Sequence, residues 1–215
     1  MASQNKHLEH LEDELINYGY GGYVASKDLI QNFVDELGGR PTGNVTVTTK
    51  WDGAPAVVCG IDPESKQFFV GTKSVFNKKE PKINFTEADI DRNHGEIPDL
   101  AKKLKYCLEY FSELNIRGVI QGDLLFTDED VVTKNIDGER YYTATPNTLT
   151  YAWPADSDLG KAVHNAKIGA VFHTYYSGTG PINTLNAGFG VSQFNLKSTR
   201  NVFLASATMD NISAK

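Results

Sequence analysis

The sequence predicts an α+β fold with antiparallel sheets flanked by helices. Strand-like runs at 55–61 and 67–71 are joined by the turn-forming segment Asp-Pro-Glu-Ser-Lys, and strands joined by so short a turn pair antiparallel. A strong amphipathic helix pattern follows at 97–115, and more strand-like runs come after it. This sequence of a meander, a helix and further strands is typical of the α+β class.

The first 40 residues predict a helical segment. Apolar residues recur at helical spacing over 5–17, and the glycine-rich stretch 18–23 then interrupts the pattern. A second helix is expected to begin at Ser26, a residue type that caps helix N-termini, and to end at Gly38 and Gly39. We therefore expect residues 1–40 to form an N-terminal helical segment and residues 41–215 to form the main domain.

The main domain is expected to begin with a meander of three strands, at 44–49, 55–61 and 67–71. Residues 77–97 are polar and weakly periodic, and we expect a loop there that includes one helical turn. The helix at 97–115 can hold Pro98 in its first turn. The remaining elements are predicted as strands at 118–126, within 141–153 and at 168–177, a helix at 156–167, and weak strands within 181–215.

Composition is that of an ordinary soluble globular chain, with 40% hydrophobic and 22% charged residues among 215. No apolar run is long enough to span a membrane and no signal peptide is evident, so we expect a cytoplasmic protein. Cys59 and Cys107 lie in apolar contexts, which predicts reduced core thiols. A net charge of -6 argues against a nonspecific nucleic-acid coat, although lysines cluster at 73–82 and 102–105, where a solvated face is the simpler interpretation.

The most informative stretch is Thr-Thr-Lys-Trp-Asp-Gly-Ala-Pro-Ala, residues 48–56. Asp52 and Gly53 signal a tight turn, and Gly53 would let the backbone approach a ligand closely. Lys50 follows an extended run. A lysine held in a partly buried corner loses its proton more readily and can act as a nucleophile, with an adjacent carboxylate to orient it or a metal. A lone lysine at a strand end is more often simply solvated, so this hypothesis needs support from other segments.

Lys-Trp-Asp-Gly resembles the K-x-D-G signature of the covalent nucleotidyltransferases, which include ATP-dependent DNA ligases, RNA ligases and mRNA capping enzymes. Three further segments resemble elements of the same superfamily in the same order: Phe-Phe-Val-Gly-Thr-Lys with Lys73, Gly-Val-Ile-Gln-Gly-Asp with Asp123, and Ile-Gly-Ala-Val-Phe-His with Phe172. The resemblance covers roughly residues 45–178. The whole chain is also similar to ligase-like proteins of large tailed bacteriophages whose role is unassigned.

The resemblance implies a ligase-type (ATP-grasp-like) nucleotidyltransferase domain and an ATP-dependent polynucleotide ligase-like activity. Lys50 would attack the α-phosphate of ATP and form a lysyl-AMP intermediate, and Asp52 and Lys73 would assist catalysis. The implied nucleotide contacts are Thr49, Lys50, Gly53, Lys73, Asp123 on the ribose, and Phe172 stacked on the base. The implied cofactors are ATP and Mg²⁺, with Asp123 as a metal ligand. The implied partners are RNA or DNA ends, with no membrane, in the cytoplasm of a phage-infected bacterium.

Two elements of the superfamily have no match. Gly188 stands where a strand of the form Glu-Gly-x-Val would place its glutamate, and Lys197 and Arg200 do not have the spacing of the final Lys-x-Lys strand. We therefore expect the domain to lack the last family strands and to be incomplete at its C-terminus. A catalytically weak or inactive nucleotide-binding or nucleic-acid-binding module is the alternative function, and a structural protein without a nucleotide site is a third. RNA versus DNA, ATP versus GTP, and the oligomeric state stay open.

Other groups are interpreted as structural. His173 lies inside an apolar strand and is expected to be a core histidine rather than a catalytic base. The tyrosines of 18–23 are expected in a loop between helices, although such rings also stack on bases in single-strand binders. Asn147 follows Pro146 between two strand-like runs, and no physical argument assigns it a role.

Overall fold

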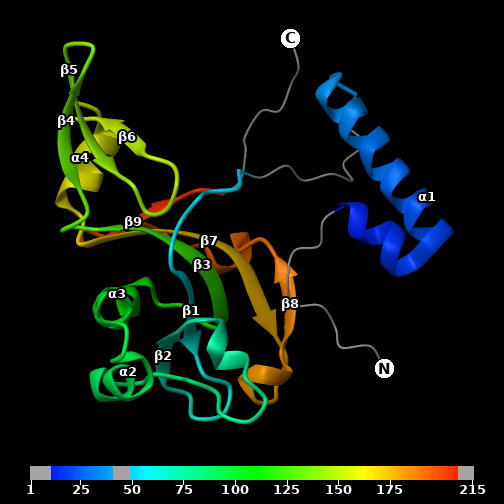
Figure 1. Ribbon diagram of the computed structural model, residues 1–215, viewed down its shortest axis with the longest axis horizontal. Helices are drawn as coiled ribbons and strands as arrows, with labels where there is room; N and C mark the ends of the chain where they lie inside the picture. The colour runs from blue at the N-terminus through cyan, green and yellow to red at the C-terminus, as the bar shows by residue number, and fades with distance from the viewer. Residues whose placement is uncertain (1–10, 41–48, 208–215) are drawn as a thin grey trace. The chain divides into compact units, whose positions relative to one another are not determined.

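Two compact units make up the chain in the computed structural model, which describes residues 11–40 and 49–207 (Figure 1). The first unit contains the N-terminal helix and extends to Lys50, and the second runs from Trp51 to Ala207. The predicted domain boundary after residue 40 adjoins residues 41–48, which lie outside the described residues together with nearly all of the predicted strand 44–49.

Helix α1 (Leu11–Leu37) forms the first unit. Gly19, at φ 56° and ψ -130°, interrupts it, so the glycine-rich stretch does break the helix. Two helices therefore meet at Gly19, inside the stretch expected to separate them, although the other residues of that stretch are helical and form no longer loop. Ser26 does not cap a helix, because it lies inside α1, is buried, and donates a hydrogen bond from its hydroxyl to the carbonyl of Leu11 over 3.3 Å.

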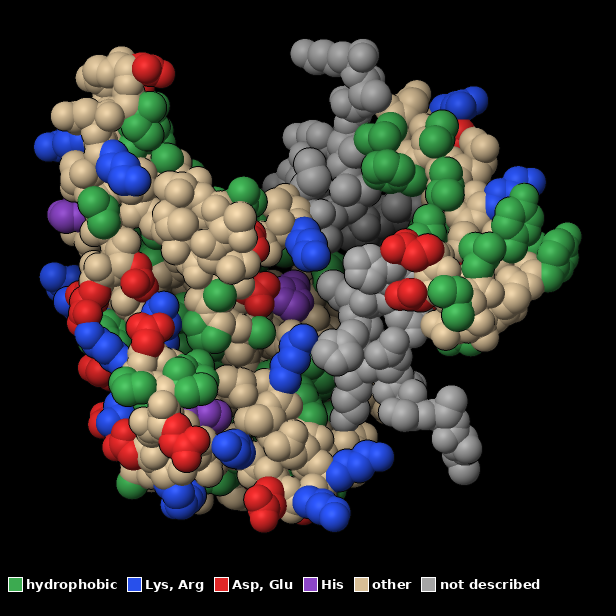
Figure 2. All heavy atoms as spheres, in the orientation of Figure 1, with side chains coloured by type: hydrophobic (Ala, Val, Ile, Leu, Met, Phe, Trp, Pro, Cys, Tyr) green, Lys and Arg blue, Asp and Glu red, His purple; other side chains and the backbone are tan. Residues whose placement is uncertain are grey.

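The end of α1 is as predicted, since Gly38 and Gly39 follow it and Gly39 adopts a φ of 73°. Most of the helix surface is exposed, and its buried residues are Gly22 and Ser26. Apolar side chains line much of α1 in Figure 2.

A six-stranded sheet forms the centre of the second unit. Five strands follow the order β2-β1-β3-β7-β8 with antiparallel pairing throughout, and β9 pairs with β7 in parallel. The strands are β1 (Ala56–Ile61), β2 (Phe68–Gly71), β3 (Val119–Thr127), β7 (Ile168–Ser177), β8 (Asn186–Phe189) and β9 (Val202–Ala205). The predicted strands at 55–61, 67–71, 118–126 and 168–177 are thus confirmed. Two short strands, β8 and β9, also follow β7, within the segment 181–215 where weak strands were expected.

A smaller antiparallel sheet, in the order β4-β5-β6, carries helix α4 (Asp158–Asn165). Its strands are β4 (Val132–Ile136), β5 (Glu139–Ala144) and β6 (Tyr151–Pro154). The sequence predicted β5, β6 and α4 but not β4. All five residues of β4 are exposed, so this strand leaves no pattern of burial in the sequence.

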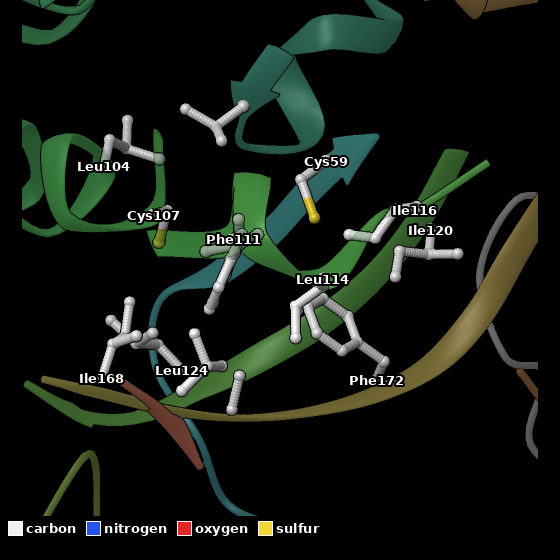
Figure 3. Close-up of a cluster of buried hydrophobic side chains, with 14 of the residues drawn as sticks. Cys59, Leu104, Cys107, Phe111, Leu114, Ile116, Ile120, Leu124, Ile168 and Phe172 are labelled. Atoms are coloured by element: carbon white, nitrogen blue, oxygen red, sulfur yellow. The ribbon is translucent and has the colours of Figure 1, made fainter. Parts of the chain in front are cut away.

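Helices α2 (Glu87–His94) and α3 (Pro98–Tyr110) lie beside β2 and β1 in Figure 1, and α3 packs on β2 and β7. Pro98 is the first residue of α3, as predicted, and the 3-10 helix η2 (Phe111–Leu114) continues it. Beneath α3 lies the first apolar cluster of the unit (Figure 3), which contains Cys59 and Cys107. Both cysteines are free and buried, as predicted.

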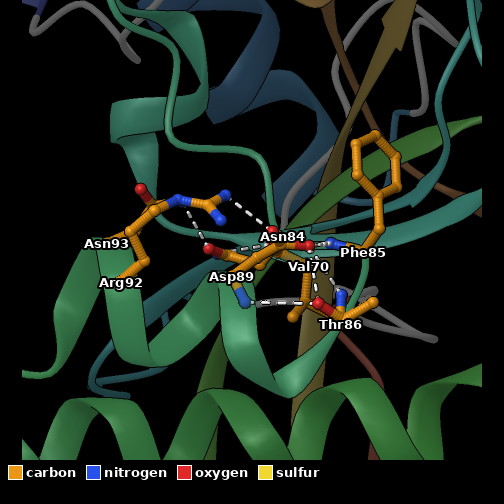
Figure 4. A network of polar contacts seen from close by, with 7 residues as sticks. All are labelled: Val70, Asn84, Phe85, Thr86, Asp89, Arg92 and Asn93. Carbon is orange, nitrogen blue, oxygen red and sulfur yellow. Dashed lines mark hydrogen bonds and ion pairs between the residues drawn. The ribbon is translucent and has the colours of Figure 1, made fainter.

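Helix α2 lies in the segment expected to be a loop, and polar contacts stabilise it (Figure 4). Thr86 and Asp89 form a capping box, in which each side chain accepts a hydrogen bond from the backbone N–H of the other residue. Asn84 is fully buried and donates from its side chain to the carbonyl of Val70 over 2.9 Å. A helix stabilised by caps and side-chain amides has little apolar periodicity, and this explains why it escaped prediction.

The predicted α+β class is confirmed. Three short 3-10 helices complete the described elements of the second unit: η1 (Lys73–Phe76), η3 (Ile182–Thr184) and η4 (Ser192–Phe194). Across the described residues, no helix combines the length and apolarity needed to cross a membrane.

Candidate functional site

The four segments that carry the resemblance converge on one sheet. The Lys-Trp-Asp-Gly segment leads into β1, Lys73 follows β2, and Asp123 and Phe172 lie on β3 and β7. These four strands are consecutive neighbours in the sheet. Ala56 pairs with Asp123, and Gly122 pairs with Phe172, so residues far apart in sequence share one region.

The turn after Lys50 lies directly on β3. Ala54 donates its N–H to the carbonyl of Leu124 over 2.9 Å, and Leu124 donates in return to the carbonyl of Pro55 over 3.1 Å. A Cβ added to Gly53 would come within 2.6 Å of the Asp123 Cβ. Gly53 thus allows a close backbone approach to strand β3, and the expected approach to a ligand stays a prediction.

Asp52 connects this turn to the loop between β5 and β6 through hydrogen bonds. Its carboxylate accepts hydrogen bonds from the Asn147 side chain (2.8 Å) and from the backbone N–H groups of Thr148 (2.8 Å) and Leu149 (2.9 Å). The Asp52 N–H in turn donates to the hydroxyl of Tyr151 over 2.6 Å. Asp52 thus positions the turn, and Asn147, which had no assigned role, is one of its partners.

Trp51 anchors the same turn from the other side. Its indole N–H donates to the carbonyl of Ser206 over 3.0 Å, and its ring lies 5.0 Å from that of Tyr151, centroid to centroid. Lys50 and Thr49 precede Trp51, and both are exposed residues of the first unit. The predicted nucleophile is therefore joined by a peptide bond to a residue held firmly in the second unit.

One face of β3 carries a polar strip between two apolar clusters. Because side chains alternate across a strand, Gln121 and Asp123 share a face with Val119 and Leu125. Val119 belongs to one apolar cluster and Leu125 to another. A β-bulge in β7 adds His173 and Thr174 to the strip, which we define as Gln121, Asp123, His173 and Thr174.

Hydrogen bonds fix the strip. The Nε2 of His173 lies 3.5 Å from Oδ2 of Asp123, and its Nδ1 lies 2.8 Å from Oγ1 of Thr174. The Asp123 and His173 side chains are 23% and 17% exposed, so both are partly accessible to solvent. Gln121 is buried and accepts a hydrogen bond from Tyr176 over 2.6 Å, and burial raises the pKa of Tyr176 to about 12. His173 is thus a mostly buried, hydrogen-bonded member of the strip, as expected for a histidine inside β7, although it lies outside the apolar clusters.

Phe172 does not lie where the resemblance places a base-stacking ring. The ring is 4% exposed and packs edge-on against Phe111, with 5.4 Å between centroids. Figure 3 shows it beside Leu114 inside the apolar cluster under α3. Its neighbours in sequence, Val171 and His173, belong to the opposite face. The predicted stacking role of Phe172 is therefore wrong, because alternation along β7 turns this ring into the core.

Phe189 is the aromatic ring that flanks the strip. It is 44% exposed, lies on β8, and stacks on His173 with an interplanar angle of 20° and 6.4 Å between centroids. No sequence feature selected Phe189, since residues 181–215 show only weak strand signals. Lys73, in contrast, is exposed in η1 directly after β2, next to its N-cap Thr72.

A model of a protein family, described as a family of unknown function (DUF6267), matches residues 5–215. The chain belongs to the DUF6267 family. No curated protein and no solved structure matches the chain. Since the family description carries no activity, function has to be argued from the residues of the site.

The strands after β7 bring few charged groups to the sheet. β8 reads Asn-Ala-Gly-Phe and β9 reads Val-Phe-Leu-Ala, so neither supplies the glutamate or the lysines of the superfamily pattern. Lys197 and Arg200 are exposed between η4 and β9. Among the residues that the structure describes, no three His, Cys, Asp or Glu side chains gather as a metal site.

Proposed function

We propose that this chain is a ligase-like nucleotidyltransferase that binds ATP over the polar strip and transfers AMP to Lys50. The observation that carries the proposal is the contact of the Lys-Trp-Asp-Gly turn with Asp123, through Gly53 and the paired backbone of Ala54 and Leu124. The resemblance was drawn from short motifs, and nothing in those motifs requires these segments to touch. Their contact supports a shared site.

Chain connectivity keeps Lys50 near that site. Its Cα is three peptide steps of about 3.8 Å from that of Gly53, and is therefore within about 11 Å of it. Trp51 and Asp52, the residues between them, are both hydrogen-bonded within the second unit.

The transfer step uses groups of this chain. The neutral Lys50 amine attacks the α-phosphorus, a nitrogen–phosphorus bond forms, and the bond to the β-phosphate oxygen breaks, so pyrophosphate leaves with the bond's electron pair. The amine must give its proton to water or a base before or during this attack. Lys73 offers positive charge to the phosphates from the end of β2. Phe189, rather than Phe172, offers an exposed ring to the base.

Mg²⁺ fits this arrangement through one carboxylate. Asp123 is partly exposed, and Mg²⁺ is usually held by one or two carboxylates while phosphate oxygens and water complete its shell. When bound there, Mg²⁺ would neutralise charge on the phosphates. Asp123 also remains the carboxylate that a ribose hydroxyl would meet, as the resemblance implies.

A nucleotide-binding module without turnover is the second candidate. It is favoured by β8 and β9, which carry no glutamate or lysine toward a bound phosphate. Nucleotide transfer relies on several such groups around the α-phosphate. Binding would then be retained while the transfer step is slow or absent.

Incubation with ATP labelled at the α-phosphate, in the presence of Mg²⁺, separates the two candidates. A transferase acquires label that is stable to base and labile to acid, and Lys50→Ala abolishes it. Lys134→Ala, which removes an exposed lysine from β4, is the matched control and keeps the label. The transferase proposal is wrong if neither labelled ATP nor labelled GTP modifies the protein. Saturable ATP binding without label would then support the second candidate.

A further inference from the structure

Helix α1 folds back on itself, so that its two arms, residues 11–18 and 20–37, run antiparallel. Ser26 of the second arm donates its hydroxyl to the carbonyl of Leu11 over 3.3 Å. Gly22 lies so close to the first arm that an added Cβ would come within 1.9 Å of a backbone oxygen. Gly22 and Ser26 are the buried residues of this fully described helix, so no apolar side chain of α1 is buried. Helices in proteins are stabilised mainly by packing of an apolar face, and α1 has such a face without a partner.

The outward face of the second arm carries an apolar stripe (Figure 2). Its residues recur at alternating intervals of three and four, which is the spacing of the a and d positions of paired helices. We define the α1 seam as Tyr20, Tyr23, Lys27, Ile30, Val34 and Leu37. Tyr20 is 81% exposed, and Ile30 and Val34 are each 51% exposed. The seam therefore has the sequence pattern of a helix that packs against another helix.

An open groove of about 600 Å³ lies between the two arms, beside the seam. Leu15 of the first arm and Tyr23 and Ile30 of the second arm are among its apolar lining residues. Glu12 and Lys27 also line it and bring one charge of each sign. A groove with this balance does not favour an acidic or a basic partner. It is complementary in charge to a copy of itself, as a two-fold interface requires.

The exposed apolar area is sufficient for a dimer. It amounts to roughly 600 Å² in each copy, given the exposed fractions of the side chains and about 150–250 Å² for a whole aromatic side chain. A standard protein interface buries about 800 Å² of each partner, including its polar rim. Single soluble proteins rarely expose contiguous apolar patches larger than a few hundred Å².

We propose that the α1 seam binds the α1 seam of a second copy of this chain, antiparallel and about a two-fold axis. Two folded-back helices then form a four-helix bundle. A parallel pairing would place Lys27 against Lys27 of the second copy. An antiparallel pairing centred between Lys27 and Ile30 instead places each lysine stem beside an isoleucine, and the amine can extend to the edge. The inference concerns the first unit alone, so it goes beyond the proposed function and does not depend on it.

Sedimentation velocity of the full chain over a range of concentrations tests the dimer. We expect a concentration-dependent change from monomer to dimer. Ile30→Asp should weaken dimerisation by at least about a hundredfold, because the two-fold axis buries the added carboxylate twice. Leu159→Asp, which changes a residue of α4 that is 61% exposed, is the matched control and should dimerise like the wild type. Urea unfolding of each variant checks that it is folded.

Disulfide formation tests the orientation. Cys59 and Cys107 are buried, so a cysteine introduced on the seam is the accessible thiol. A mixture of Tyr23→Cys and Val34→Cys should give a linked dimer on oxidation, and each variant alone should give little. Equal linkage of Tyr23→Cys alone would overturn the antiparallel arrangement.

Two outcomes of the sedimentation experiment would overturn the proposal. One is a dimer of Ile30→Asp as tight as that of Leu159→Asp. The other is a protein that stays monomeric at every concentration. A hydrophobic dye then identifies the true occupant of the seam: a monomer that leaves the dye unbound has covered the seam with its own second unit, and one that binds the dye at Ile30 keeps the seam for a different protein.

Discussion

Replacement of Asp52 by alanine should destabilise the second unit. The carboxylate accepts three hydrogen bonds of 2.8–2.9 Å from Asn147, Thr148 and Leu149. Hydrogen bonds to a charged group contribute about 1.5–3 kcal/mol each. The three donors belong to exposed residues, so water can replace much of this stabilisation when the carboxylate is removed. We take about 1 kcal/mol for each bond, which gives a loss of about 2–3 kcal/mol for Asp52→Ala.

Urea unfolding followed by tryptophan fluorescence measures this loss, because Trp51 adjoins Asp52. A loss of 2–3 kcal/mol corresponds to a fall in Tm of about 4–12 °C for a unit of this size. Asp156→Ala, in an exposed turn, is the matched control and should change the free energy of unfolding by less than about 0.5 kcal/mol. If Asp52→Ala is as stable as Asp156→Ala, the carboxylate does not fasten the turn, and a purely catalytic role would be the better explanation.

Three further changes test other parts of the account. Gly53→Ala should lower the free energy of unfolding by about 1–3 kcal/mol in urea, because its Cβ would come within 2.6 Å of the Asp123 Cβ; an unchanged midpoint would refute the contact. Burial and, to a smaller extent, the charge of Lys82 lower the pKa of His94 in the folded protein. Below about pH 6.5 the unfolded chain therefore binds more protons than the folded protein, and the free energy of unfolding should fall as the pH drops through that range. His94→Gln should show a smaller loss of stability between about pH 7.5 and about pH 5.5, and parallel curves for the two proteins would contradict this. Phe189→Ala should weaken ATP binding in calorimetry by about 1–3 kcal/mol while the urea midpoint stays the same, whereas equal affinity would exclude stacking on this ring.

The elements with strong apolar patterns were predicted closely. The run Ile-Gly-Ala-Val-Phe-His-Thr-Tyr-Tyr-Ser gave β7 with its observed bounds, because a strand buried on both faces is apolar along nearly its whole length. β4 and α2 were missed for the opposite reason. The first is fully exposed, and the second depends on the capping box of Thr86 and Asp89.

The site was predicted in its segments but not in its side chains. The motifs selected Asp123 and the Lys-Trp-Asp-Gly turn, and the structure brings these two segments into contact. Strand register and a β-bulge determine which side chain of β7 faces Asp123. Neither feature can be recognised from the local sequence. For that reason Phe172 was chosen, although His173 is the residue that lies against Asp123.

The location of the nucleotide can be measured directly by amide chemical shifts during titration with α,β-methylene-ATP, an analogue that cannot transfer AMP. The account predicts saturable shifts concentrated at Gly53, Asp123, His173 and Phe189, with few changes in β4 on the smaller sheet. Shifts that are absent at saturating analogue, or that gather away from these residues, would contradict it.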